Sequence, residues 1–163
     1  MHGNKGSIDG DGPAAMRYTE CRLSPFGQMM TDGIKKNTVP FIPNFDGSEQ
    51  EPTVLPTLFP NLLINGASGI AAGYATNIPP FNPCEAIDAI IAKIDSPNCR
   101  MDKILSIMPA PDFPTAGVIS NLDGVREAYK TGRGKIFIGG EMKKLSNKQI
   151  VITSIPFETN KSD

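Results

Sequence analysis

The sequence predicts an α+β fold, and three observations favour it. Residues 82–95 open with Asn-Pro and continue with aliphatic residues at helical spacing, which is typical of a capped amphipathic helix. Residues 149–155 alternate in the manner of a strand. Helices and strands do not follow one another in a regular βαβ order, so a parallel sheet is not expected. The high content of glycine (16) and proline (15) indicates many turns around a modest core.

The N-terminal region is expected to contain one helix. Residues 1–12 are rich in Gly, Asp and Ser and are expected to form a loop, and residues 14–19 a short extended segment. Ser24 is a favoured N-cap and Pro25 a favoured first helical residue, so a helix is expected to begin there. Gly33 is expected to end it, because glycine is common just after helix C-termini.

Prolines and small residues decide the interpretation of the next region. Pro40 and Pro43 restrict residues 38–45 to an edge strand or irregular extended chain. The expected order after that is a turn at 46–48, an extended connector at 52–60, an apolar run at 61–65 and a small-residue segment at 66–73.

The clearest predicted helix begins after Asn82. Asparagine is a natural N-cap, Pro83 suits the first helical position, and Glu85 stands three residues after the cap, as in a capping box. The helix is expected to run to Asp95 and to bury one apolar face. That face would consist of Ala86, Ile87, Ile90, Ile91 and Ile94.

The C-terminal region is expected to mix helices and strands. Asp123 is expected to cap a helix that runs through Tyr129 and ends at Gly132. The other expected elements are a helix at 101–108, a rigid link at 109–114, a strand at 118–119, and strands at 135–138 and 149–155 paired across a polar turn at 143–148.

Charge and cysteine content exclude several classes of protein. The net charge of -1 gives no overall basic signature, so nucleic-acid binding would rest on local patches or on a larger assembly. Cys21, Cys84 and Cys99 lack metal-ligand spacing and His2 is the single histidine, so we expect three free thiols in a reducing cytoplasm and no zinc site. No apolar stretch approaches the roughly 20 residues that span a bilayer, so no membrane insertion is expected.

One short segment indicates a function. Residues 14–20, Ala-Ala-Met-Arg-Tyr-Thr-Glu, resemble the active-site motif of type IIA DNA topoisomerases, the family of bacterial gyrase and topoisomerase IV. Residues 6–12 resemble the lead-in to that motif. The resemblance continues in order through residues 43–47, 51–52, 59–63, 65–66, 69–71, 75–80, 111–115, 131–134, 155–156 and 160–161. Residues 1–4 and 72–76 are more similar to the topoisomerase IV branch, and gyrase is the alternative.

The resemblance implies a place within a longer DNA-cleaving chain, the A subunit of such an enzyme. Residues 1–35 would be the end of a winged-helix domain with the catalytic tyrosine, and residues 36–163 an incomplete tower domain of mixed α/β structure. The implied partners are DNA and the B subunit of topoisomerase IV (or of gyrase), in an A2B2 heterotetramer in the cytoplasm, associated with the nucleoid. The implied cofactors are Mg²⁺ and ATP, both bound by the partner subunit.

The resemblance makes Tyr18 the nucleophile and gives Arg17 the role of stabilising the transition state. A phenolate that attacks a phosphodiester forms an aryl ester, which stays activated because the pKa of a phenol, about 10, lies well below that of an aliphatic alcohol. In this family the link is to the 5′ phosphate. The Arg17 guanidinium would offer forked donors to the non-bridging oxygens. Neighbours in an extended segment point to opposite faces, so Arg17 and Tyr18 meet one phosphate only if the chain bends or Arg17 reaches past it.

Three further residues are candidates for DNA binding. Ile70 lies among small residues and could wedge between bases from the minor groove, which is the bending role that the resemblance assigns to it. Lys5 and Ser7, in the Gly-rich loop, are candidates for phosphate contacts. Asp9 and Asp11 of the same loop are expected to be solvated, so no metal site is expected in this chain.

Plainer interpretations stand beside these. By residue type alone, Tyr18 and Ile70 are more often packing residues and Arg17 a surface charge. The lysines of residues 143–148 are expected to form a solvated turn, with a phosphate contact as the alternative. The isolated chain could also be a non-catalytic DNA-binding or assembly module, since it lacks the family's recognition helix, metal site and dimer gate.

Overall fold

The computed structural model describes residues 2–7 and 10–162. The chain forms two compact units, unit 1 with Met1–Ser7 and Asp11–Asn61, and unit 2 with Ile8–Gly10 and Leu62–Asp163. Asp9, expected in a solvated loop, lies outside the described residues. Among the described residues, no helix combines the length and the apolar character needed to cross a membrane.

Unit 1 consists of short elements joined by loops. Its elements are the 3-10 helix η1 (Met16–Tyr18), the helix α1 (Pro25–Thr31), the 3-10 helix η2 (Ile34–Lys36), and the strands β1 (Phe41–Pro43) and β2 (Gln50–Pro52). The Ser24 hydroxyl accepts a hydrogen bond of 3.0 Å from the backbone N–H of Gly27, which confirms the predicted start of α1. Gly33 has a φ of -87°, so α1 ends without the expected left-handed glycine.

The strands β1 and β2 pair antiparallel around a turn. Phe41 is opposite Pro52 and Pro43 is opposite Gln50. The turn was predicted from Asp46-Gly47-Ser48, and there the Asp46 carboxylate accepts hydrogen bonds from the Ser48 hydroxyl (2.6 Å) and N–H (3.0 Å). These bonds hold the pKa of the Asp46 carboxyl below its ordinary value. The sequence interpretation placed residues 52–60 in a connector and did not identify β2.

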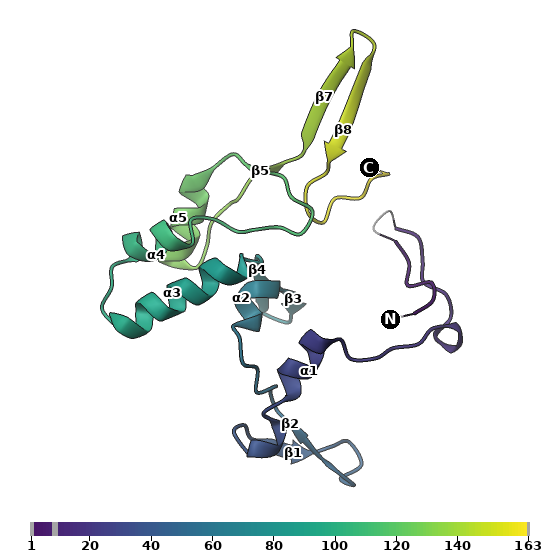
Figure 1. Cartoon of the computed structure of the whole chain (residues 1–163), viewed down its shortest axis with the longest axis vertical. Helices are drawn as coiled ribbons and strands as arrows, with labels where there is room; N and C mark the ends of the chain where they lie inside the picture. Colours follow the sequence, from purple (N-terminus) through teal and green to yellow (C-terminus); the bar gives the residue numbers. More distant parts are fainter. Residues whose placement is uncertain (1, 8–9, 163) are drawn as a thin grey trace. The chain divides into compact units, whose positions relative to one another are not determined.

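Unit 2 contains most of the regular structure (Figure 1). Its helices are α3 (Pro83–Asp95), α4 (Met101–Ile107) and α5 (Leu122–Thr131), and α2 (Asn61–Asn65) begins at its border. Its strands are β3 (Ala67–Ala71), β4 (Tyr74–Ile78), β5 (Val118–Ile119), β6 (Ile138–Gly139), β7 (Glu141–Ser146) and β8 (Gln149–Ser154). Within the described portion of the chain, all four sheets are antiparallel pairs, β1-β2, β3-β4, β5-β6 and β7-β8.

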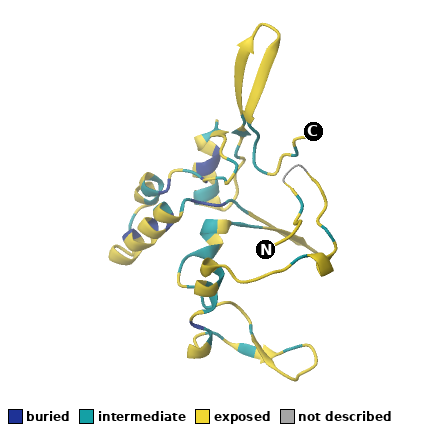
Figure 2. Cartoon of the chain, turned by 45° about the vertical axis from the view of Figure 1, so that its right-hand side comes forward, coloured by how far each residue is buried: buried dark blue, intermediate teal, exposed yellow. Residues whose placement is uncertain are grey.

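The core of unit 2 forms where the helices meet. Figure 2 shows buried residues at α3 and α5, whereas the β7–β8 hairpin is exposed almost throughout. The buried cluster is Phe81, Ala86, Ala89 and Met108, and Leu63, Ile104, Ile107 and Tyr129 pack against it. The Tyr129 hydroxyl donates a hydrogen bond of 3.0 Å to the carbonyl of Met108. A core of this size is small, as the glycine and proline content predicted.

Helix α3 begins as predicted but buries a different face. The Asn82 side chain accepts hydrogen bonds from the N–H groups of Cys84 (3.0 Å) and Glu85 (3.4 Å), which confirms the cap. Ala86 of the predicted face is buried as expected, but the predicted burial of the four isoleucines was wrong. The buried positions are Ala86, Ala89 and Ala92, whereas the exposed fractions of Ile87, Ile90, Ile91 and Ile94 are 41%, 36%, 49% and 71%. Residues three apart share a face, and the small alanines let Phe81 and Met108 approach closely.

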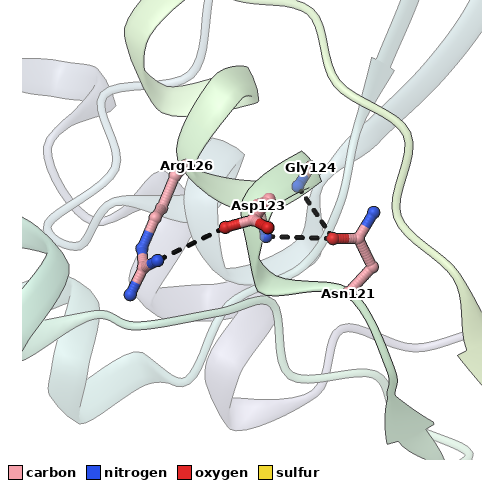
Figure 3. Close-up of polar contacts among 4 residues, drawn as sticks. All are labelled: Asn121, Asp123, Gly124 and Arg126. Atoms are coloured by element: carbon pink, nitrogen blue, oxygen red, sulfur yellow. Dashed lines mark hydrogen bonds and ion pairs between the residues drawn. The ribbon is translucent and has the colours of Figure 1, made fainter.

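Helix α5 begins earlier than predicted. Its cap is Asn121, whose side-chain oxygen accepts from the N–H groups of Asp123 (3.0 Å) and Gly124 (3.3 Å), as Figure 3 shows. Asp123 instead lies in the first turn and pairs with Arg126 at 3.4 Å. Asn121 is the cap because it precedes the first helical residue, where an acceptor can reach two unpaired N–H groups. Gly132 has a φ of 75° and ends the helix as predicted.

The strand pairing near the C-terminus differs from the prediction. Residues 135–138 do not pair with 149–155; instead Ile138 of β6 pairs with Ile119 of β5.

The predicted turn at 143–148 is wrong, because Lys143 and Lys144 lie within β7. The reversal is tighter and falls after Ser146. The predicted mixture of helices and strands is confirmed, while the division into winged-helix and tower domains remains a prediction.

Candidate functional site

Tyr18 lies at the end of a 3-10 turn. The expected extended segment at 14–19 is wrong, because residues Met16–Tyr18 form η1. The N–H of Tyr18 donates to the carbonyl of Ala15 (2.9 Å), and the N–H of Thr19 donates to that of Met16 (3.1 Å). The Thr19 hydroxyl donates to the same Met16 carbonyl at 3.2 Å. These local hydrogen bonds bend the backbone just before and at the tyrosine.

The bend brings the side chains of Arg17 and Tyr18 together. The Arg17 Cζ atom lies 4.8 Å from the centroid of the Tyr18 ring, which is cation–π geometry. The Tyr18 side chain is 67% exposed. Arg17 makes no ion pair with a carboxylate in the portion of the chain that the structure describes. An exposed tyrosine and a guanidinium that lacks a carboxylate partner among the described residues therefore lie side by side.

The backbone of the N-terminal segment supports this turn. His2 and Glu20 exchange two backbone hydrogen bonds, of 2.9 and 3.0 Å, in an antiparallel bridge. The N–H of Ala14 donates to the carbonyl of Asn4 at 3.1 Å. Gly3 has a φ of +101°, and a Cβ there would stand 2.9 Å from the Tyr18 carbonyl oxygen. Glycine is thus required for the close approach of the two backbone segments.

Lys5 and Ser7 lie in the loop that this pairing closes. The N–H of Gly6 donates to the Asn4 side chain at 2.9 Å. The Ser7 hydroxyl donates to the Asp11 carboxylate at 2.7 Å, and the Ser7 N–H donates to the Asp11 carbonyl at 3.2 Å. Lys5 is exposed. Asp11 therefore accepts hydrogen bonds that hold its own loop, a role that the sequence interpretation did not anticipate.

Ile70 lies on a hairpin that the sequence interpretation missed. Strands β3 and β4 pair antiparallel, with Ile70 opposite Ala75 and Ala71 opposite Tyr74. Two residues, Ala72 and Gly73, connect them, and Gly73 has a φ of 80°. Glycine and alanine are poor strand formers, so residue types gave little signal. The signal that could have found the hairpin is the short small-residue break between two segments of equal length.

The tip of this hairpin stands clear of the rest of unit 2. Ile70 is 94% exposed and Tyr74 is 83% exposed. A Cβ added at Gly69 or Gly73 would meet no atom within 4 Å. The apolar side chain of Ile70 is therefore fully presented to solvent on a slender ribbon, as a wedge would be.

A cavity lies at the base of the same hairpin. Its volume is about 350 Å³. The lining residues belong to unit 2 and are Asn65, Gly66, Ala67, Ser68, Asn77, Ile78, Pro79, Pro80, Phe113, Gly134, Ile136, Ile138, Phe157 and Glu158.

The described residues offer no obvious metal site. Within residues 2–7 and 10–162, no group of three or more His, Cys, Asp or Glu side chains could hold an ion. Cys21, Cys84 and Cys99 are free thiols, as predicted.

Tyr129 is half-buried, and burial, followed by the negative charge of Glu85, raises the pKa of its hydroxyl to about 12. Its hydroxyl donates a hydrogen bond to the carbonyl of Met108 and so has a structural role.

Comparison with known proteins agrees with the motif. The family model for the A subunits of DNA gyrase and topoisomerase IV matches residues 1–163. The chain is 56% identical to the A subunit of DNA topoisomerase 4 of Bacillus subtilis (strain 168), over 100% of this chain and 21% of the relative. It is 53% identical to the protein of the same name from Streptococcus pyogenes serotype M18, over 99% of this chain and 20% of the relative.

A relative from the other branch is nearly as similar. The A subunit of DNA gyrase from Metamycoplasma arthritidis is 55% identical, over 99% of this chain and 18% of the relative. The chain therefore spans about one fifth of the length of the relatives it matches.

Proposed function

The chain belongs to the family of DNA gyrase and topoisomerase IV A subunits, and on that basis we propose that it is the DNA-cleaving segment of a topoisomerase IV A subunit. The parent enzyme would break both strands of one duplex, pass another through, and rejoin the ends. The observation that carries the proposal is the contact of Arg17 with the exposed Tyr18, at 4.8 Å from guanidinium carbon to ring centroid, inside the motif at 14–20.

Tyr18 is the proposed nucleophile. Its hydroxyl oxygen attacks the phosphorus of a phosphodiester and loses its proton to solvent, and the bond from phosphorus to the 3′ oxygen breaks. The 3′ oxygen gains a proton, and the 5′ phosphate stays bound to the tyrosine. Resealing is the reverse, because the aryl ester keeps the energy of the broken bond. The 67% exposure of Tyr18 supports the proposal, since DNA must reach the hydroxyl.

Arg17 is proposed to stabilise the charge that develops on the phosphate. A guanidinium is permanently charged and offers forked N–H donors to two oxygens at once. The turn at η1 removes the difficulty of reach that an extended segment would create, since Arg17 already lies beside Tyr18. Lys5 and Ser7, in the adjoining loop, are proposed to contact neighbouring phosphates.

Ile70 is proposed to bend the DNA. An exposed isoleucine on a ribbon of glycine and alanine can enter the minor groove and separate neighbouring base pairs, at a cost of roughly a few kcal/mol for the unstacked step. The gain would be a bent duplex that contacts more of the protein.

The remaining components are proposed to come from elsewhere in the parent assembly. Mg²⁺ would neutralise phosphate charge during cleavage. The resemblance to type IIA topoisomerases implies that the B subunit binds Mg²⁺ and ATP, and we adopt that assignment. The assembly would be an A2B2 heterotetramer acting on DNA in the cytoplasm, at the nucleoid. Residues 1–35 would end a winged-helix domain and residues 36–163 would begin a tower domain.

The gyrase A subunit is the second candidate, because the gyrase relative is 55% identical over nearly the whole chain. Family membership does not favour the alternative of a non-catalytic module. The two enzymes differ in their product. The full-length chain, combined with its B subunit, should unlink interlocked circles efficiently if it is topoisomerase IV, and should introduce negative supercoils if it is gyrase.

Trapping of the covalent intermediate tests the proposed chemistry. The full-length complex is incubated with Mg²⁺ and DNA labelled at its 3′ ends, denatured, and digested with protease. The proposal predicts label on a peptide that contains residues 14–20, joined through a 5′ phosphate. Label on another peptide, or a link through a 3′ phosphate, would contradict it.

A further inference from the structure

The β3–β4 hairpin has two faces with different chemistry. Side chains alternate along each strand, and directly opposite residues share a face. Ile70 and Ala75 therefore share a face with the next opposite pair of that face, Ser68 and Asn77. The other face carries the pairs of Ala71 with Tyr74 and of Gly69 with Thr76. The wedge thus has two polar neighbours on its own side of the ribbon.

Ser68 and Asn77 have hydrogen-bonding capacity that the fold does not use. Both are exposed. In the described stretches of the chain, neither side chain forms a hydrogen bond with another residue. They also line the cavity at the base of the hairpin, while the tip beyond them has open space around Gly69. The pair therefore lies between the wedge and the body of unit 2, where DNA held by Ile70 would pass.

We propose that Asn77, with Ser68 opposite it, contacts base edges in the minor groove about two base pairs from the step that Ile70 opens, and so sets a base preference for bending. This inference rests on the proposed function. Two residues along a strand cover about 6.8 Å, which is about two base-pair rises in duplex DNA. Asn77 would thus meet a base pair about two positions from the wedge.

The chemistry of the groove defines what such a contact can recognise. The minor groove presents the N3 of adenine and the O2 of thymine as acceptors, and a G·C pair adds the amino group of guanine. An amide carries both donors and an acceptor, and a hydroxyl does the same on a smaller scale. The guanine amino group is the feature that separates the two kinds of pair in this groove, so a base preference of this contact would be one between A·T and G·C and would not separate A·T from T·A.

The test measures bending of short duplexes by energy transfer between dyes on their two ends. The full-length chain, in complex with its B subunit, carries Tyr18→Phe so that the duplex stays uncut while its bending is measured. In the duplexes, each base pair within three positions of the bend is changed in turn between A·T and G·C. The reference protein should show a base preference of about 2- to 10-fold at one position, the range of one net hydrogen bond. Asn77→Ala should remove that preference, and Ser68→Ala should reduce it.

Thr76→Ala is the matched control, because Thr76 is a polar residue of the same strand on the opposite face. It should leave the base preference unchanged. The inference would be overturned if Asn77→Ala kept the preference, if Thr76→Ala removed it equally, or if the reference complex bent all duplexes alike. Failure of the proposed cleavage chemistry would appear elsewhere, as a covalent link that does not depend on Tyr18, and would leave the bending result intact.

Discussion

The guanidinium of Arg17 lies over the ring of Tyr18, with Cζ 4.8 Å from the ring centroid. The contact arises because Met16–Tyr18 is a 3-10 turn and not an extended segment. In a strand the two side chains would point to opposite faces. The turn therefore places a permanent positive charge beside the hydroxyl that is proposed to attack DNA.

Replacement of Arg17 should slow DNA cleavage in the full-length complex. Arg17→Ala is expected to lower the single-turnover cleavage rate by about 100-fold or more, the usual effect of losing a donor to the developing charge. Arg17→Lys should recover only a fraction of the rate, because an ammonium lacks the planar fork. Arg22→Ala is the control, since Arg22 is a nearby exposed arginine paired with Glu20. An equal loss in the control would contradict a specific role for Arg17.

Gly3→Ala should displace Tyr18, although the two residues lie far apart in the sequence. The φ of +101° and the 2.9 Å approach of a Cβ to the Tyr18 carbonyl predict a local cost of roughly 1–3 kcal/mol. Cleavage at saturating DNA should slow, and the amides of His2 and Glu20 should exchange hydrogen faster. Gly12→Ala is the control, because a Cβ there meets nothing within 4 Å. If both variants behave alike, Gly3 does not position Tyr18.

The features predicted correctly are those that local chemistry decides. Ser24 and Asn82 cap helices because their side chains reach N–H groups two or three residues away. The cap of α5 was misassigned because Asn121 and Asp123 are both good caps, and only the backbone path decides between them. The face that α3 buries depends on Phe81 and Met108, which lie outside the helix. Patterns within one segment could not reveal those partners.

The candidate site was predicted by a different route. Tyr18 and Ile70 were singled out by resemblance to a family motif, since residue type alone favours packing for both. The secondary-structure propensities of the residues predicted neither the turn at η1 nor the hairpin around Ile70. The 3-10 turn is supported by the pairing of His2 with Glu20, and the hairpin is built from weak strand formers.

Ile70→Ala should leave the fold intact and reduce DNA bending. Burying an isoleucine contributes roughly 1.5–3 kcal/mol, so the ratio of bent to straight complexes should fall about tenfold or more. Energy transfer between the ends of a labelled duplex measures this ratio. Ile150→Ala is the control, because Ile150 is 67% exposed on another hairpin of unit 2. Equal bending by the Ile70→Ala and wild-type complexes would refute the wedge.

Tyr129 should make the fold sensitive to alkaline pH. Its folded-state pKa is raised from 10.0 to about 12, so the unfolded chain loses this proton first as pH rises. The stability that the neutral hydroxyl contributes is therefore complete below pH 10 and is lost between about pH 10 and pH 12. Denaturant unfolding over this window should show a fall in the free energy of unfolding that Tyr129→Phe reduces. A fall of the same size in Tyr129→Phe would rule out this residue as its source.

The oxygen that joins the protein to DNA is proposed to be the Tyr18 hydroxyl. The direct test compares wild type with Tyr18→Phe in the full-length complex with its B subunit, Mg²⁺ and supercoiled DNA, stopped with detergent. The variant lacks one oxygen and keeps the ring on which Arg17 stacks, so DNA binding should be unchanged. Wild type should yield protein-linked DNA and the variant none. Protein-linked DNA in the Tyr18→Phe sample would contradict the assignment of Tyr18 as the nucleophile.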